Sequence, residues 1–194
     1  MVGIYKKKYS LLWWYTLVGF VANLLVAIIF YGSPARFPVA NTYIIAEFIL
    51  LFFFFKQQFN TKFQKASFIV LPFFCIGLAN IFYTTEAGIS LQHYKDFDAF
   101  SAAMFSLSYI LLCILGYVKI LQEKSTLHIE RSAFFWANTA IFIYTSGIFF
   151  LFLFTRYLLT HEMSTYVGQL WQINDTLLIL KSVMLSTSFF CKRP

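Results

Sequence analysis

The sequence has 194 residues, of which 60% are hydrophobic, 22% are aromatic and only 12% are charged. A soluble domain is about 45–50% apolar and about 25% charged, so this composition and a mean hydropathy of +0.71 exclude an ordinary soluble domain and predict a polytopic membrane protein. The net charge of +7 does not predict nucleic-acid binding, because the basic residues fall in loops between apolar segments.

Six apolar segments follow one another along the chain. We expect membrane spans at residues 11–30, 39–55, 68–83, 99–118, 133–154 and 170–190. Their lengths are near the ~20 residues that a helix needs to cross a bilayer. We therefore predict an all-α, polytopic transmembrane helix bundle of about six spans, with residues 1–194 forming a single transmembrane domain.

Three of these segments carry features of their own. The first resembles a signal peptide, but its apolar run exceeds a 7–15-residue core and no small-residue cleavage site follows, so we interpret it as an uncleaved span. Pro72 lies in the first turns of the third segment and is expected to bend it. Small side chains permit close helix approach, so the small residues of the fourth segment should face inward; they are Ser101, Ala102, Ala103, Ser106 and Ser108.

The lysines and arginines are distributed unevenly between the loops. The N-terminus, second loop, fourth loop and C-terminus hold three, three, three and two, whereas the first, third and fifth loops hold one each. Because cytoplasmic loops are enriched in Lys and Arg, this alternation predicts that both termini are cytoplasmic. We expect the protein in the cytoplasmic (inner) membrane of a bacterium.

Two oppositely charged residues lie within the predicted spans. Counting from the outer ends of spans six and two, Lys181 lies roughly 16 Å deep and Glu47 roughly 13 Å deep. A lone charge in hydrocarbon is costly, so we predict that the two side chains pair, directly or through one polar neighbour. The alternative is that the lysine snorkels to the interface and the carboxyl is protonated. A pair would either fix how the helices dock or act as a buried switch.

Further polar residues accompany this pair. The predicted intramembrane cluster consists of Glu47, Asn138, Tyr144, Asn174, Asp175 and Lys181. Asn174 and Lys181 are seven residues apart and therefore share one helix face. Such groups can line a small polar cavity that opens outward, or they can hydrogen-bond between helices. The sequence leaves both interpretations open.

No pattern of catalytic or metal-binding residues stands out. The three histidines lie in predicted loops or span ends, which argues against a bis-histidine haem. Cys75, Cys113 and Cys191 are scattered without metal-ligand spacing and are expected to be buried free thiols. Zinc-protease, serine-hydrolase, phosphate-loop and dinucleotide motifs are missing. We therefore predict a protein that is not an enzyme and holds no cofactor or metal.

From Tyr117 to Cys191 the chain resembles the membrane-embedded N-terminal region of a group of bacterial sensor histidine kinases. The resemblance rests on the segments Lys119–Arg131, Phe135–Asn138, Ile143–Tyr144, Ser146–Gly147, Phe149–Phe154, Leu170–Trp171 and Ile173–Asn174, and on an acidic residue in span two, Glu47. In that family the last span continues into a cytoplasmic kinase helix. This sequence ends at Pro194 without a phosphoacceptor histidine or ATP-binding domain, so the resemblance implies a sensory module without kinase activity of its own.

We accordingly expect a non-catalytic integral membrane protein that serves as a sensory, signal-input or partner-binding module. Its partners would be membrane lipid and another membrane protein or a separate kinase, and not nucleic acid. A structural subunit of a larger membrane complex is the first alternative, and a small-solute transporter or channel is the second.

Overall fold

A computed structural model describes residues 2–28, 36–86, 99–122, 129, 132–160 and 167–191, and the long segments among these are helical. The helices are α1 (Val2–Ile28), α2 (Arg36–Gln58), α3 (Thr61–Ala66), the 3-10 helix η1 (Ser67–Val70), α4 (Leu71–Glu86), α5 (Ala99–Gln122), α6 (Ala133–Thr160) and α7 (Val167–Phe190). The described part of the chain contains no strand, which confirms the all-α prediction there. His93, His161 and Glu162 lie outside these residues.

Three helical stretches are long and apolar enough to cross a membrane: Thr61–Asn80, Phe100–Gln122 and Ala133–Phe154. They correspond to the third, fourth and fifth predicted spans. A shorter apolar stretch, Ser10–Leu25, lies in α1. Membrane-crossing character is therefore found in the described part of the chain, whereas a total of six spans and the location of the termini stay predictions.

The chain divides into two compact units. Unit 1 comprises Met1–Gln64 with Thr84–Phe97, and unit 2 comprises Lys65–Tyr83 with Asp98–Pro194. Unit 1 thus holds α1, α2 and most of α3. Unit 2 holds η1, most of α4, and α5 to α7. Each unit is described by itself below.

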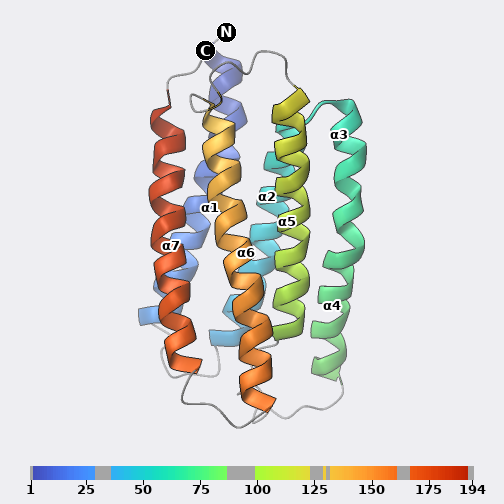
Figure 1. Cartoon of the computed structure of the whole chain (residues 1–194), viewed down its shortest axis with the longest axis vertical. Coiled ribbons are helices and arrows are strands. Elements are labelled where there is room, and N and C mark those ends of the chain that lie inside the picture. Colours follow the sequence, from blue (N-terminus) through green and yellow to red (C-terminus); the bar gives the residue numbers. More distant parts are fainter. Residues whose placement is uncertain are drawn as a thin grey trace. The chain divides into compact units, whose positions relative to one another are not determined.

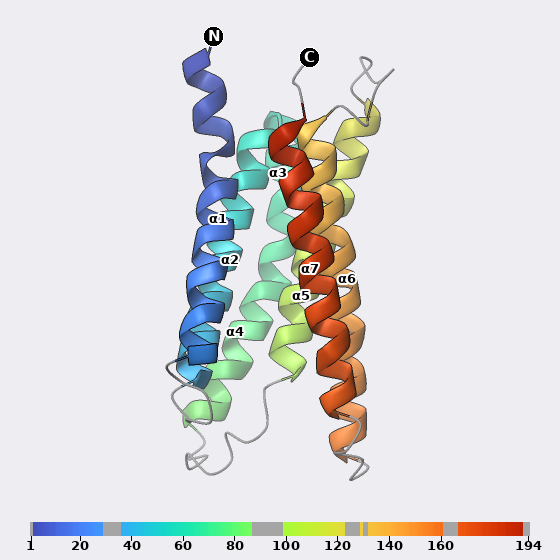
Figure 2. The ribbon, with the colours of Figure 1, turned by 90° about the vertical axis from the view of Figure 1, so that its left-hand side faces the viewer.

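In unit 1, α1 and α2 run side by side (Figure 2). Gly19 on α1 provides the closest approach, because a Cβ there would lie 3.2 Å from the hydroxyl oxygen of Tyr43 on α2. The missing side chain lets the tyrosine ring reach the backbone of α1. The apolar side chains that are buried along this hairpin are Leu12, Tyr15, Phe48, Leu51, Phe54 and Phe55.

The turn between α2 and α3 is held by two amide side chains. Gln64 Nε2 donates to the carbonyl oxygens of Lys56 (3.0 Å) and Phe59 (3.1 Å), which α2 leaves unsatisfied at its C-terminal end. Asn60 Oδ1 accepts the backbone N–H of Phe63 at 3.2 Å and so caps α3. The buried Phe59 ring lies 5.9 Å from the Phe63 ring, which anchors the turn on its inner side.

The helix that contains Pro72 changes type just before the proline. α3 passes into η1 and then α4 without a break, so the apolar helix begins at Thr61, before the expected start at Phe68. In a continuous α-helix the carbonyl of Phe68 would accept the N–H of residue 72, which proline lacks. The N–H of Leu71 bonds to that carbonyl instead, and this i→i+3 pattern is a 3-10 turn.

In unit 2, α6 lies between α5 and α7 and contacts both (Figure 1). η1 packs against α5. The predicted inward face of α5 is confirmed, because all five of its small residues are buried; they are Ser101, Ala102, Ala103, Ser106 and Ser108. On α4, Gly77 makes room for Phe105, whose ring would lie 2.7 Å from a Cβ at that position.

Candidate functional site

The most distinctive contact joins α6 and α7. Lys181, on α7, is 7% exposed, and its Nζ lies 3.8 Å from the centroid of the Tyr144 ring on α6. A cation over an aromatic face is attracted by the ring quadrupole, most strongly where water is excluded. One turn away, a Cβ on Gly147 would lie 2.5 Å from Leu177, so the glycine allows α7 to approach α6 closely. Two residues of the predicted cluster therefore meet here.

Glu47 occupies the other unit. It lies on α2, is 9% exposed, and accepts a hydrogen bond of 3.0 Å from the Tyr43 hydroxyl one turn earlier. Because Tyr43 also fills the notch at Gly19, the carboxylate is tied to the α1–α2 contact. Lys181 belongs to unit 2, so the pairing of Glu47 with Lys181 stays a prediction from the sequence.

Asn138 serves a third contact, between α6 and α5. Its side chain is fully buried, and Nδ2 donates to the backbone carbonyl of Cys113 at 3.1 Å. The other end of the amide, Oδ1, has no hydrogen-bond partner among the described residues. Gly116 lies beneath it, since a Cβ there would be 2.5 Å from Oδ1. Asn138 is thus directed to α5, whereas Tyr144 is directed to α7.

The last two residues of the predicted cluster lie nearer the start of α7. Asn174 is half-buried and Asp175 is exposed. Thr176, the exposed neighbour of Asp175, donates its hydroxyl to the Gln172 carbonyl of its own helix. Asp175 therefore lies at the surface of the described chain, unlike the buried Lys181 on the same helix.

Sequence reasoning did not single out several polar contacts that cross between helices of unit 2. Tyr117 on α5 donates to Thr139 Oγ1 on α6 at 2.9 Å. Asn80 Nδ2 on α4 donates to Ser101 Oγ on α5 at 3.1 Å. The small residues of α5 were the available signal for the second contact. For the first, a tyrosine near the end of an apolar helix is ambiguous, because such rings are also common at the membrane interface.

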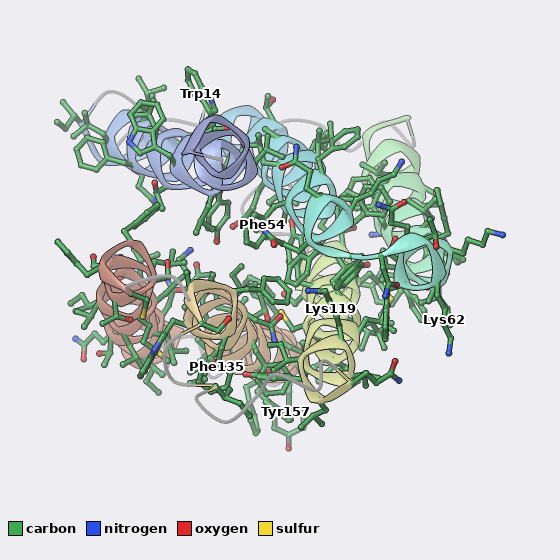
Figure 3. The ribbon with its side chains drawn as sticks, turned by 90° about the horizontal axis from the view of Figure 1, so that it is seen from above. Trp14, Phe54, Lys62, Lys119, Phe135 and Tyr157 are labelled. Atoms are coloured by element: carbon green, nitrogen blue, oxygen red, sulfur yellow. The ribbon has the colours of Figure 1, made fainter. Side chains whose placement is uncertain are left out.

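Outward-facing side chains are predominantly apolar and aromatic. Trp13 and Trp14 pack edge to face with centroids 5.2 Å apart and are both exposed, and Trp14 points away from α1 (Figure 3). Other exposed apolar residues are Phe20, Leu24, Phe53, Ile69, Phe150, Phe154, Ile173, Ile179 and Val183. Such faces suit lipid chains or the helices of another protein.

Within the described residues, no three His, Cys, Asp or Glu side chains gather as a metal site would require. None of the three cysteines forms a disulfide. The expected burial is confirmed for Cys113 but is wrong for Cys75, which is exposed, and for Cys191, which is partly exposed. Comparisons with protein-family models, with curated proteins and with solved structures found no match. The polar side chains with described partners bond either to a neighbouring helix or to the backbone of their own helix, as is usual in a helix bundle.

Proposed function

We propose that this chain is a six-span protein of the bacterial cytoplasmic membrane, with both termini cytoplasmic, and that it acts without catalysis as a signal-input or partner-binding module. The length of the remaining helices supports six spans. α1, α2 and α7 contain 27, 23 and 24 residues, and at 1.5 Å per residue each exceeds the ~30 Å thickness of a hydrocarbon core. The charged residues of α7, Asp175 and Lys181, account for its lower hydropathy.

One observation carries the functional part of this proposal: the described polar side chains of unit 2 bond either to a neighbouring helix or to the backbone of their own helix. Asn138, Tyr117 and Asn80 each donate to a neighbouring helix. Lys181 lies over an aromatic ring. A solute pathway would need these groups for its substrate, whereas a packed bundle uses them internally and presents its apolar faces to partners.

The α6–α7 contact is the element that we assign to signal input. Here a buried cation lies over the Tyr144 ring, and a small shift of α7 along α6 would move that cation off the ring at a cost in free energy. A contact with two distinct arrangements is what a membrane sensor requires. The resemblance of residues 117–191 to the membrane region of sensor histidine kinases favours a separate kinase as the receiving partner.

The test is to capture the tagged protein from its native membrane in mild detergent and to identify by mass spectrometry what is retained. The control is the same capture from cells that carry the untagged protein. Recovery of a kinase or a response regulator supports the signal-input proposal. A fixed stoichiometric set of other membrane proteins makes the chain a structural subunit instead. A chain that is recovered alone, and that carries solute flux in liposomes, would overturn the proposal in favour of transport.

A further inference from the structure

The turn between α2 and α3 concentrates positive charge. Lys56, Lys62 and Lys65 fall within ten consecutive residues, and no acidic residue occurs between Glu47 and Glu86. The bias of cytoplasmic loops toward lysine accounts for basic residues here. It does not account for the way in which the structure places them.

The polypeptide that carries these lysines is firmly held. Gln64 bonds to the carbonyl oxygens of Lys56 and Phe59, and Asn60 caps α3. The N–H of Gln64 donates to the Asn60 carbonyl at 2.8 Å. Because the backbone is fixed by these bonds, an anion that binds the lysines does not have to order the turn first.

Two of the lysines are presented outward. Lys62 and Lys65 are exposed on α3, three residues apart and hence on one side of the helix. Figure 3 shows Lys62 pointing away from the helices. By contrast, Lys119 at the end of α5 has its Nζ 5.1 Å from the centroid of the Phe134 ring, so that ammonium already has an aromatic partner.

The same continuous helix presents apolar side chains directly below the lysines. Phe68 and Ile69, on η1, are exposed, and Ile76 on α4 is exposed one to two turns further along. This stretch, Thr61–Asn80, is long and apolar enough to cross a membrane. Ammonium groups therefore stand at the end of a membrane-crossing helix whose outer side is apolar.

We propose that the two exposed lysines of α3, Lys62 and Lys65, bind the phosphate headgroup of an anionic phospholipid. Lipid is favoured over a soluble anion because the charges continue into an exposed apolar surface that acyl chains can cover. An ammonium binds phosphate as a point charge, which suits a headgroup without fixed orientation. The inference rests on the membrane embedding in the proposed function, but not on its signalling role.

The test uses the full chain purified in mild detergent, with bound lipid counted by native mass spectrometry. Phosphatidylglycerol is compared with phosphatidylcholine of the same acyl chains. Three variants are needed: Lys62 and Lys65 both changed to Gln; the same two changed to Arg, which keeps the charge; and Lys119→Gln, which removes a lysine elsewhere. Each lysine near an anionic surface contributes about 1 kcal/mol, so each neutralised lysine should weaken phosphatidylglycerol binding roughly fivefold.

The wild type, the Arg variant and Lys119→Gln should retain phosphatidylglycerol in preference to phosphatidylcholine, and the Gln variant should lose that preference. Added salt should weaken the preference of the wild type by screening, a readout that needs no variant to fold. Equal retention of both lipids by the wild type overturns the inference. So does displacement of phosphatidylglycerol by equimolar inorganic phosphate, which would indicate a site for free anions. Alkaline carbonate extraction of native membranes tests the membrane embedding separately from lipid binding. Release of the chain by carbonate would contradict the embedding itself, whereas a chain that stays in the membrane but shows no lipid preference would contradict only the lipid site.

Discussion

The two polar atoms of the Asn138 side chain differ in hydrogen bonding. Nδ2 is bonded to the Cys113 carbonyl, and Oδ1 lies unpartnered above Gly116 among the described residues. We predict that Gly116→Ala destabilises the protein by about 1–3 kcal/mol, the usual cost of overpacking, because the new methyl group would lie 2.5 Å from Oδ1. The free energy of unfolding, measured by denaturant titration in detergent micelles, checks this.

The double variant Gly116→Ala with Asn138→Ala tests whether a clash with the Asn138 amide causes the loss of stability. Asn138→Ala should cost about 0.6 kcal/mol for the interhelical hydrogen bond plus a cavity term. It also vacates the space that a methyl group at position 116 needs, so the double variant should be more stable than the sum of the two single effects. Strict additivity would show that the added methyl group and the Asn138 amide do not compete for the same space.

The contact of Lys181 with Tyr144 can be separated into ring and hydroxyl. Tyr144→Phe keeps the aromatic face beneath the ammonium, and Tyr144→Leu removes it. We expect the leucine variant to lose about 0.5–2 kcal/mol relative to the phenylalanine variant, since desolvated cation–π contacts have that size. Thermal unfolding in detergent of both variants gives the comparison. If Tyr144→Phe is as unstable as Tyr144→Leu, the hydroxyl rather than the ring holds the lysine.

At the scale of the element, α3, η1 and α4 form one continuous helix, and Pro72 determines where its 3-10 turn lies. We predict that Pro72→Ala restores a donor for the Phe68 carbonyl and converts η1 into α-helix. Amide hydrogen exchange around residues 67–72 should then slow. Cys75→Ala, an exposed substitution in the same helix, should leave that exchange unchanged. Unaltered exchange in Pro72→Ala would mean that packing of η1 on α5 dictates the 3-10 turn.

The helices themselves were predictable, because runs of apolar residues near 20 in length are a strong signal. The inward face of α5 was also predictable from its small residues, such as Ser101 and Ser108. The helix α3 was not, since Thr61–Ala66 is polar in composition and reads as a loop. Its stability comes from Gln64 and Asn60 bonding to backbone atoms. A backbone acceptor such as the Cys113 carbonyl leaves no trace in the sequence, so the partner of Asn138 was out of reach.

At the scale of the whole molecule, the two charged residues that the sequence analysis placed within predicted spans, Glu47 and Lys181, belong to different units. Glu47 is bonded to Tyr43 in unit 1, and Lys181 lies over Tyr144 in unit 2. Their pairing stays a prediction that rests on matched depth and opposite sign in the sequence. Buried polar groups of this kind specify register in other bundles.

A double-variant cycle decides whether the pair exists. Removing one member of a buried ion pair strands the other, at a cost of about 3–5 kcal/mol, so Glu47→Gln and Lys181→Met should each destabilise the protein strongly. The combined variant should recover much of that loss, because neither charge then remains in hydrocarbon. The measurement is the free energy of unfolding of all four proteins in one detergent, together with the yield of folded protein.

Asp175→Asn supplies the matched control, because Asp175 is a charge on the same helix as Lys181 but is exposed. Combined with Glu47→Gln it should give additive effects. If Glu47→Gln and Lys181→Met are also additive, the two charges are held independently, Glu47 by Tyr43 and Lys181 by Tyr144. If the combined variant is restored in stability but no longer retains a partner that the wild type retains, the pair is a switch rather than only a register device.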